Sequence, residues 1–312
     1  MTKPVALWIP LNRSENGCKN RALTLRQALE IIDENRQLMP SSAATVQPVA
    51  LMRLGLFLPT LKRKGQSTGI NTVDASKELQ KLELAQAEGY TDILISGPRL
   101  SMETDFKVWA GVILAFSKYG LDGNVIELPF SEFATFCGYS TKDKDKALRL
   151  RLADSLMRLR GTTIRFANDK AGSGEVTGLL SRGRWNEEDD VISLSADSSV
   201  WELYQFDRQV LMHLFVLQQL ANKGTAQALY TFLESLPPKP IPLSFERIKR
   251  RLMLTSPNNQ QNRLINKAID ELKTVGYLDG DVVKKDGEWF LIINDRTPRP
   301  DLKGRKRVYK AE

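Results

Sequence analysis

The sequence predicts an α+β fold in which one arrangement of a short helix, a long helix and a β-hairpin occurs twice. Three observations lead to this prediction. The chain has 312 residues and is 42% hydrophobic, a size that suits about two domains. Two segments share one order of apolar, polar and glycine positions. Each of them is followed by two runs of strand-forming residues around a turn.

The residues at the start of the chain predict an appendage that precedes the repeated units. Residues 24–38 have apolar side chains at helical spacing, with Thr24 as the N-cap of an amphipathic helix. Residues 39–48, MPSSAATVQP, carry Pro near both ends and small polar residues between, as linkers do. A segment that packs only loosely is an equally good interpretation. We expect an N-terminal helical appendage and linker over residues 1–47.

A hairpin and a helix are expected before the first repeated segment. Residues 82–87 (LELAQA) and 90–96 (YTDILIS) alternate around Glu88 and Gly89, which predicts two paired strands. A helix should follow over residues 104–119, because apolar residues recur there at helical spacing.

The two repeated segments have the same order of residue types and of predicted elements. Each begins with Pro, an apolar residue and a capping serine, Ser131 or Ser244, which opens a short helix. A polar turn and a long amphipathic helix follow, and the helix ends at a glycine, Gly161 or Gly276. The lengths from serine to glycine are nearly equal. The two segments span residues 128–166 and 241–280.

A hairpin is predicted after each long helix. In the first copy TTIRF (162–166) should pair with EVTGLLSRGRW (175–185) around the AGSG turn. In the second, YLDGDVV (277–283) should pair with EWFLII (288–293) around Lys285-Asp286-Gly287. Helix, helix, turn, helix and hairpin form the winged-helix pattern. The sequence therefore predicts two tandem winged-helix domains, at residues 48–200 and 201–296, and a basic tail at 297–312.

The charge balance indicates an acidic polymer as partner. The chain carries 45 Lys and Arg against 37 Asp and Glu, a net charge of +8. Ribosomal and membrane-surface proteins share this feature. The excess of positive charge is greatest in the tail, which has seven basic residues and one acid between Arg296 and Lys310. Such an arm adds salt-sensitive affinity for DNA, although a merely soluble tail has the same composition.

Several classes of function are disfavoured. His213 is the single histidine and lies in an apolar run, and Cys18 and Cys137 are the two cysteines, so a zinc finger cannot be assembled. The Gly-rich stretch at 171–178 lacks the lysine of a nucleotide-binding loop. We expect no cofactor, no metal and no enzymatic activity. The alternative from a different class of function is an enzyme, namely a metal-dependent nuclease or strand transferase.

The chain shows no sign of export or membrane insertion. Its start lacks an apolar secretory signal, and its longest apolar stretches, such as 108–116, are shorter than a membrane span. We expect a cytoplasmic protein.

The start of the second long helix is typical of a helix that recognises DNA bases. In SPNNQQNR (256–263), Ser256 is the expected N-cap and Pro257 the expected first helical residue. Arg can hold guanine, and Asn or Gln can hold adenine, through paired hydrogen bonds in the major groove. A capped and solvated helix start is the alternative. The candidate DNA-binding residues on this helix are Ser256, Asn258, Asn259, Gln261, Asn262, Arg263, Asn266 and Lys267.

Basic residues nearby are candidates for phosphate contacts. They are Lys249, Arg250 and Arg251 on the preceding helix, and Lys284 and Lys285 on the hairpin. The first long helix begins STKDKDKALRLR, in which acids interrupt the positive charge. Its candidates, for phosphate contact or for a protein interface, are Lys142, Lys144, Lys146 and Arg149.

Five stretches of the chain resemble a known family. They are VQPVALMRLGLFLPTLK (46–62), GPRLSMETDFKVWAGVI (97–113), ELPFSEFATFCG (127–138), ELYQFDRQVL (202–211) and AQALYTFLESLP (226–237). They closely resemble the RepA initiators of RepFIB-type plasmids, within the iteron-binding Rep proteins with tandem winged helices. The similarity runs from about residue 46 to residue 300.

The resemblance implies a replication role. It implies that the C-terminal winged helix reads repeated origin sequences, while the N-terminal one contacts the DNA backbone or a second subunit. It also implies a dimer that represses its own gene and a monomer that opens the origin and helps recruit the host initiator and replicative helicase. The family's reading segment falls on Gln261, Asn262 and Arg263, where relatives carry more arginine. The rival is a tandem winged-helix transcriptional regulator without a replication role.

Overall fold

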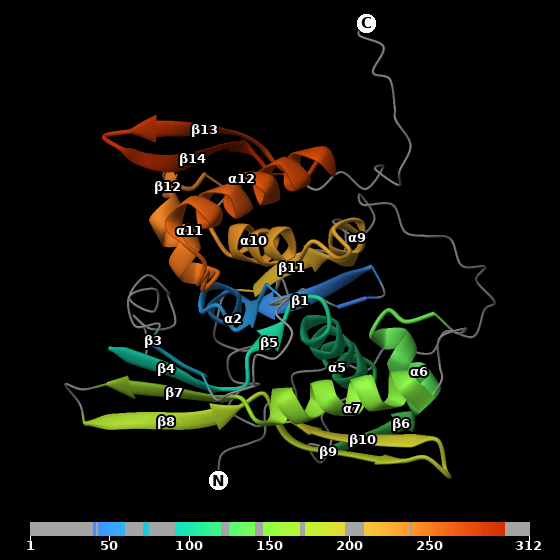
Figure 1. The fold of residues 1–312 in the computed structure, drawn as a ribbon. Helices are drawn as coiled ribbons and strands as arrows, with labels where there is room; N and C mark the ends of the chain where they lie inside the picture. The colour runs from blue at the N-terminus through green and yellow to red at the C-terminus, as the bar shows by residue number, and fades with distance from the viewer. Residues whose placement is uncertain are drawn as a thin grey trace, which may run out of the picture.

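The structure is a computed structural model with a mixed α/β fold (Figure 1). The amphipathic helix expected at 24–38 and the tail at 297–312 lie outside the described residues. The structure describes residues 40–41, 43–59, 71–74, 91–119, 125–140, 146–168, 172–196, 209–237 and 239–296, and for 71–74 and 209 it describes the backbone alone.

The expected linker contains a buried strand. β1 (Ala44–Pro48) pairs antiparallel with β11 (Gln209–His213), and every β1 residue is buried. Trp109 Nε1 donates a hydrogen bond to Gln47 Oε1 at 3.0 Å, so this amide is satisfied inside the core. The prediction of a linker over residues 39–48 was therefore wrong, because the partner that buries this polar-looking strand lies far along the chain.

A helix and a short strand follow β1 in the chain. α2 (Val49–Arg53) is buried throughout. β2 (Phe57–Leu58) follows and pairs parallel with β5 (Leu100–Ser101).

Four antiparallel strands form the largest sheet. Their order is β3-β4-β7-β8. β4 is the strand expected at 90–96, and its described neighbours are β3 and β7; residues 82–87 lie outside the described part. The hairpin expected around AGSG is confirmed by the β7·β8 pairing. The four strands are β3 (Asn71–Asp74), β4 (Asp92–Gly97), β7 (Thr163–Asn168) and β8 (Ser173–Gly178).

A second group of elements surrounds a three-stranded sheet of order β6-β10-β9. The long helix predicted at 104–119 is confirmed as α5. Asp105 of α5 accepts from Arg158 of α7 at 2.8 Å, an ion pair that joins the two long helices. The elements are α5 (Asp105–Tyr119), β6 (Val125–Pro129), α6 (Phe130–Phe136), α7 (Lys146–Arg160), β9 (Leu180–Asn186) and β10 (Val191–Ala196).

Two predictions for this group were wrong. Ser131 does not cap α6, because Pro129 is the N-cap and Ser131 lies within the first turn. Residues 180–185 do not pair with β7. The chain leaves the four-stranded sheet after Gly178, buries Leu179 and Leu180, and continues as β9, whose partner is β10.

The C-terminal group repeats the same strand order. β12 pairs with β14 and β14 with β13, as β6 pairs with β10 and β10 with β9. Ser244 is the N-cap of α11, since its Oγ accepts from the Arg247 amide, as predicted. The elements are α9 (Leu214–Gln219), α10 (Gly224–Glu234), β12 (Leu243–Ser244), α11 (Phe245–Arg251), α12 (Asn258–Thr274), β13 (Asp279–Lys285) and β14 (Glu288–Asp295).

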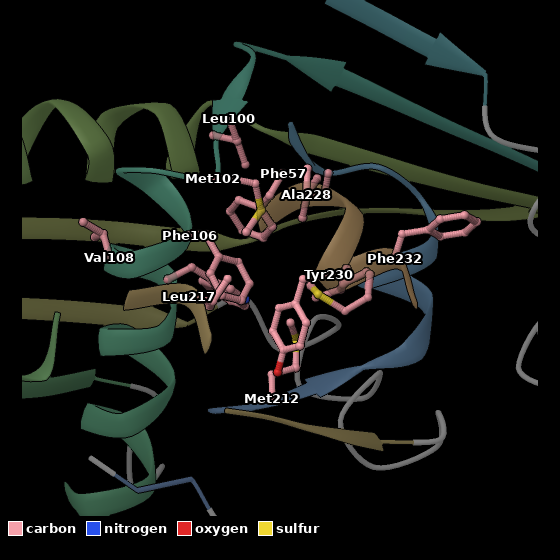
Figure 2. Close-up of a cluster of buried hydrophobic side chains, with 14 of the residues drawn as sticks. Phe57, Leu100, Met102, Phe106, Val108, Met212, Leu217, Ala228, Tyr230 and Phe232 are labelled. Carbon is pink, nitrogen blue, oxygen red and sulfur yellow. The ribbon is translucent and has the colours of Figure 1, made fainter. Parts of the chain in front are cut away.

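One core joins the two groups. Phe57 of β2 meets Phe106 of α5 edge-to-face at 5.1 Å, and Tyr230 and Met212 lie in the same cluster (Figure 2). Arg53 of α2 donates to the Ser235 carbonyl at 2.8 and 3.1 Å. Residues 44–58 therefore contact both groups of elements and hold them against each other.

Candidate nucleic-acid interface

α12 presents one polar face to solvent. Its apolar side chains Ile265, Ala268, Ile269 and Leu272 are buried, and α10 packs behind them. The opposite face exposes Asn259, Gln260, Arg263 and Lys267. In Figure 1 this helix lies beside the β13–β14 hairpin at one end of the molecule.

The helix begins one residue later than expected. Pro257 is the N-cap, with φ −54° and ψ 148°, and α12 starts at Asn258. Ser256 therefore lies before the cap, and its Oγ is buried with no hydrogen-bond partner among the described residues. The Pro257 carbonyl accepts from the Gln260 and Gln261 amides, which starts the helical hydrogen bonding. The prediction that Ser256 caps this helix was wrong.

Gln261 holds the turn before the helix. Its Nε2 donates to the Leu254 carbonyl at 3.0 Å and to the Ser256 carbonyl at 2.5 Å. Both donors of the amide are thus occupied within the protein, and the side chain is half-buried. Gln261 was predicted to face bases, whereas the structure shows it fixing the backbone that leads into α12.

Lys249 connects α11 to the start of α12. Its Nζ lies 2.5 Å from Asn258 Oδ1 and 2.5 Å from Glu246 Oε1, and its side chain is only 8% exposed. Arg251 is buried and its Nε donates to the Met52 carbonyl at 2.9 Å. Of the three consecutive cations on α11, the structure exposes Arg250 alone.

The remaining candidates lie at the edge or on the open face of α12. Asn262 and Asn266 are half-buried, and Asn262 Oδ1 has no partner among the described residues. Asn259, Arg263 and Lys267 are exposed, as predicted. Gln260 is exposed beside them; its place in the same amide run was the available signal, but it was not among the predicted contacts.

The tip of the β13–β14 hairpin carries two lysines next to α12, together with the acids Asp286 and Glu288. Lys284 and Lys285 are exposed near the turn, where Asp286 and Gly287 have φ of +50° and +82°. Lys284 Nζ lies 5.7 Å from the centre of the Trp289 ring on the paired strand. Trp289 in turn contacts Phe245 of α11, with 6.3 Å between ring centres. This packing fixes the hairpin relative to the helices.

The corresponding surface of the first group is different. Lys146 is exposed, but Arg149 stacks on the Phe130 ring at 4.1 Å and forms an ion pair with Asp190. The tip of the β9–β10 hairpin consists of four acids, residues 187–190. Lys142 and Lys144 lie outside the described residues. The tip of the first hairpin is thus acidic, whereas the tip of the second carries Lys284 and Lys285 beside Asp286 and Glu288.

The described residues contain no cluster of three or more His, Cys, Asp or Glu side chains arranged to hold a metal ion. His213 is half-buried, and burial lowers its pKa. Burial also raises the pKa of the Cys137 thiol well above its usual range. Within the described part of the chain, no helix is long and apolar enough to cross a membrane.

Comparison with known proteins identifies the family. Residues 72–234 match the family model described as Initiator Replication protein, WH1. The Replication protein RepA of Escherichia coli is 52% identical over 88% of this chain and 95% of its own length. That of Salmonella typhi is 46% identical over 92% of this chain and 83% of its own. The RepFIB replication protein A of Escherichia coli is 42% identical over 84% of this chain and 82% of its own.

One solved structure supports the fold. Domains 2 and 3 of RctB superpose with a TM-score of 0.53 over 80% of this chain and 98% of that chain, at 12% sequence identity. The family model and the RepA relatives confirm the resemblance inferred from the five sequence stretches. From the family match and these identities over most of its length, the chain belongs to the replication initiator family of the RepA proteins.

Proposed function

We propose that this initiator binds directly repeated sequences at a plasmid origin, with α12 in the major groove and the β13–β14 hairpin on the adjacent backbone. The observation that carries the proposal is the exposed edge of α12, where Asn259, Arg263 and Lys267 lie on one face. No described residue forms an ion pair with Arg263. An unpaired guanidinium on an exposed helix face is free to donate two hydrogen bonds to a guanine.

The topology supports two tandem winged helices. In each group a helix precedes a strand, two helices follow, and a hairpin closes the sheet with the same strand order. We infer winged-helix domains over residues 48–200 and 201–296, with β9–β10 as the wing of the first and β13–β14 as the wing of the second. The β7–β8 hairpin is then an insertion between the long helix and its wing. Residues 44–48 belong with both domains.

The contacts divide the candidate residues by role. Asn259 and Arg263 are proposed to read bases, with Asn262 and Asn266 at the edge of the same face. Lys249, Asn258 and Gln261 are proposed as positioning residues, because their polar atoms already bind within the protein. The exposed cations are proposed to contact phosphates: Arg250, Lys267, Lys284 and Lys285.

The partners implied by the family are further proposals. The protein is proposed to act by binding and not by catalysis. It represses its own gene as a homodimer, and as a monomer it opens the origin and helps recruit the host initiator and replicative helicase. The acidic β9–β10 tip favours protein contact over base reading for the first domain, because carboxylates repel phosphates.

A protection footprint of the full chain on DNA flanking its gene tests the proposal. We expect several protected blocks in direct repeat. A single protected palindrome at the promoter would instead indicate a transcriptional regulator without a replication role. The same DNA fragment cloned without another origin should replicate only when the protein is supplied.

A further inference from the structure

Two buried arginines connect the short helix α2 to the domain that carries α12. Arg251 of α11 is 5% exposed, and its Nε donates to the Met52 carbonyl of α2 at 2.9 Å. In the other direction, Arg53 of α2 is 8% exposed and donates to the Ser235 carbonyl after α10 at 2.8 and 3.1 Å. Each guanidinium therefore crosses from one group of elements to a backbone carbonyl of the other.

The two acceptor carbonyls lie at helix ends. Met52 is in the last turn of α2, and Ser235 is the C-cap of α10. Carbonyls at these positions lack a partner within their own helix, and a nearby arginine can supply the donor. Loss of either guanidinium would leave a buried carbonyl short of this donor, which costs free energy in the interior. The two contacts therefore fix where α2 lies against α10 and α11.

Gly55 allows α2 and α11 to approach each other. It follows the end of α2 with φ +76°, in the left-handed region that favours glycine. A Cβ at this position would lie 2.9 Å from the Arg251 carbonyl oxygen and 3.2 Å from Arg251 Nη1. A larger residue would push the end of α2 away from α11. We name this cluster the α2 clamp; it consists of Met52, Arg53, Gly55, Ser235 and Arg251, which are all buried.

α12 packs on the two helices that the α2 clamp holds. Both α10 and α11 contact it. The Phe232 ring of α10 also lies 5.5 Å from the Arg251 guanidinium, so α10, α11 and α2 meet at this arginine. In Figure 1, α2 lies beneath α10 and α11, on the side away from α12. A buried cluster in this place can act on α12 only through the helices between them.

We propose that the α2 clamp sets the orientation of α12 relative to the first domain, with Arg53 and Arg251 as positioning residues. Paired hydrogen bonds to a base need one geometry, held within about 0.5 Å, whereas flexible lysines can follow a phosphate. A reading helix that moves on its support therefore loses base contacts before it loses phosphate contacts. The inference rests on the proposed function and adds what holds the reading helix in place.

Gly55→Ala tests the α2 clamp without removing a charge. The added Cβ should separate α2 from α11 and lower the ratio of cognate to random affinity about fivefold or more, the equivalent of one base contact. Gly172→Ala is the matched control, because Gly172 also has a left-handed φ, +63°, but open space around it. Fluorescence anisotropy, well below the unfolding temperature of each variant, gives the ratios. An unchanged ratio for Gly55→Ala overturns the proposal, as does an equal fall for Gly172→Ala.

Arg53→Met and Arg251→Met test the two arginines, and they replace Gly55→Ala if that variant does not fold. Each change keeps an apolar side chain and removes the donors, so cognate affinity should fall more than random affinity. Arg247→Met is the charge-matched control, because its guanidinium lies 5.4 Å from the same Phe232 ring. This control should lower both affinities alike. Equal losses on both DNAs for Arg251→Met would show an effect of charge alone and overturn its positioning role.

A distance measurement without DNA tests the orientation directly. Nitroxide labels at Asp154→Cys on α7 and Lys273→Cys on α12, both exposed positions, report the separation of the two domains. The chain carries Cys18→Ser, and Cys137 is buried. Pulsed electron spin resonance should give one narrow distance distribution for this chain. Adding Gly55→Ala or Arg251→Met should broaden or shift it, whereas the control variants should not. The same distribution in all of them overturns the proposal.

The measurement without DNA separates this inference from the proposed function. Failure of the natural chain to prefer a repeat over random DNA would contradict the proposed function, and the distance distributions would still decide whether the α2 clamp holds α12. A normal preference for the repeat together with an unchanged distribution in Gly55→Ala would keep the function and remove the α2 clamp.

Discussion

Lys249 Nζ lies 2.5 Å from Asn258 Oδ1, so a buried cation of α11 holds the first residue of α12. The same ammonium pairs with Glu246, which leaves it no part in phosphate binding as the structure stands. Lys249 therefore helps to fix where α12, the proposed reading helix, begins.

Replacement of Lys249 by Met should weaken DNA binding indirectly. The Met side chain has a similar volume but releases Asn258, so we expect the free energy of unfolding to fall by about 1.5–3 kcal/mol, the usual contribution of a hydrogen bond to a charged group. DNA affinity should fall while the salt dependence of binding stays unchanged, because no phosphate contact is lost. Thermal unfolding and titrations at several salt concentrations measure both. A reduced salt slope would show that Lys249 contacts phosphate after all.

Arg263→Ala should reduce affinity for the cognate repeat by about 1–3 kcal/mol and much less for random DNA. The reason is the loss of paired hydrogen bonds to one base. Lys273→Ala, an exposed cation near the other end of α12, is the matched control and should change both affinities equally and slightly. Fluorescence anisotropy with both DNAs provides the measurement. Equal losses on the two DNAs for Arg263→Ala would remove its base-reading role.

Lys285→Ala should weaken binding to all sequences alike and lower the slope of log K against log salt by about 1. Lys285 is exposed beside the hairpin turn, and its proposed role is to contact phosphates without reading bases. Asp286→Asn changes the charge of the same turn in the opposite direction and should strengthen binding at low salt. Specificity, the ratio of cognate to random affinity, should stay constant. A change in specificity would place this hairpin at base edges.

Glu234→Gln should remove one source of pH-dependent stability. Burial raises the pKa of Glu234, while the hydrogen bond from Tyr277 opposes that shift. A carboxyl whose folded pKa is raised stabilises the fold below its unfolded pKa, near 4.5, and this stabilisation is lost as pH rises through the folded pKa. The Gln variant still accepts from Tyr277 and should therefore gain stability relative to the natural chain above that window. Urea titrations across the pH range check this, and parallel curves for both proteins would contradict it.

The sequence predicted those elements whose signals are local. α5, the cap at Ser244, the AGSG hairpin and the buried face of α12 all follow from spacing or turn chemistry within a few residues. Residues 44–48 were missed because Ala, Thr and Gln look like linker residues until β11 and Trp109 enclose them. The first hairpin was wrongly extended through residues 180–185 because nothing local marks Gly178 as the point where the chain changes sheets.

The candidate site shows the same division. Amide and basic residue types correctly located a polar helix face, with Arg263 and Lys267 exposed. Which amides are free depends on neighbours outside the helix, namely the carbonyls of Leu254 and Ser256 and the ammonium of Lys249. Residue type alone cannot distinguish an Asn or Gln that faces solvent from one that fixes a turn.

The pairing of β1 with β11 constrains synthesis of the protein on the ribosome. Ala44 lies opposite His213, so the first described strand has no partner until most of the chain has been made. At bacterial rates of about 5–20 residues per second, that interval lasts roughly ten to thirty seconds. During it the N-terminal half carries an unpaired strand that neighbouring nascent chains or chaperones can reach.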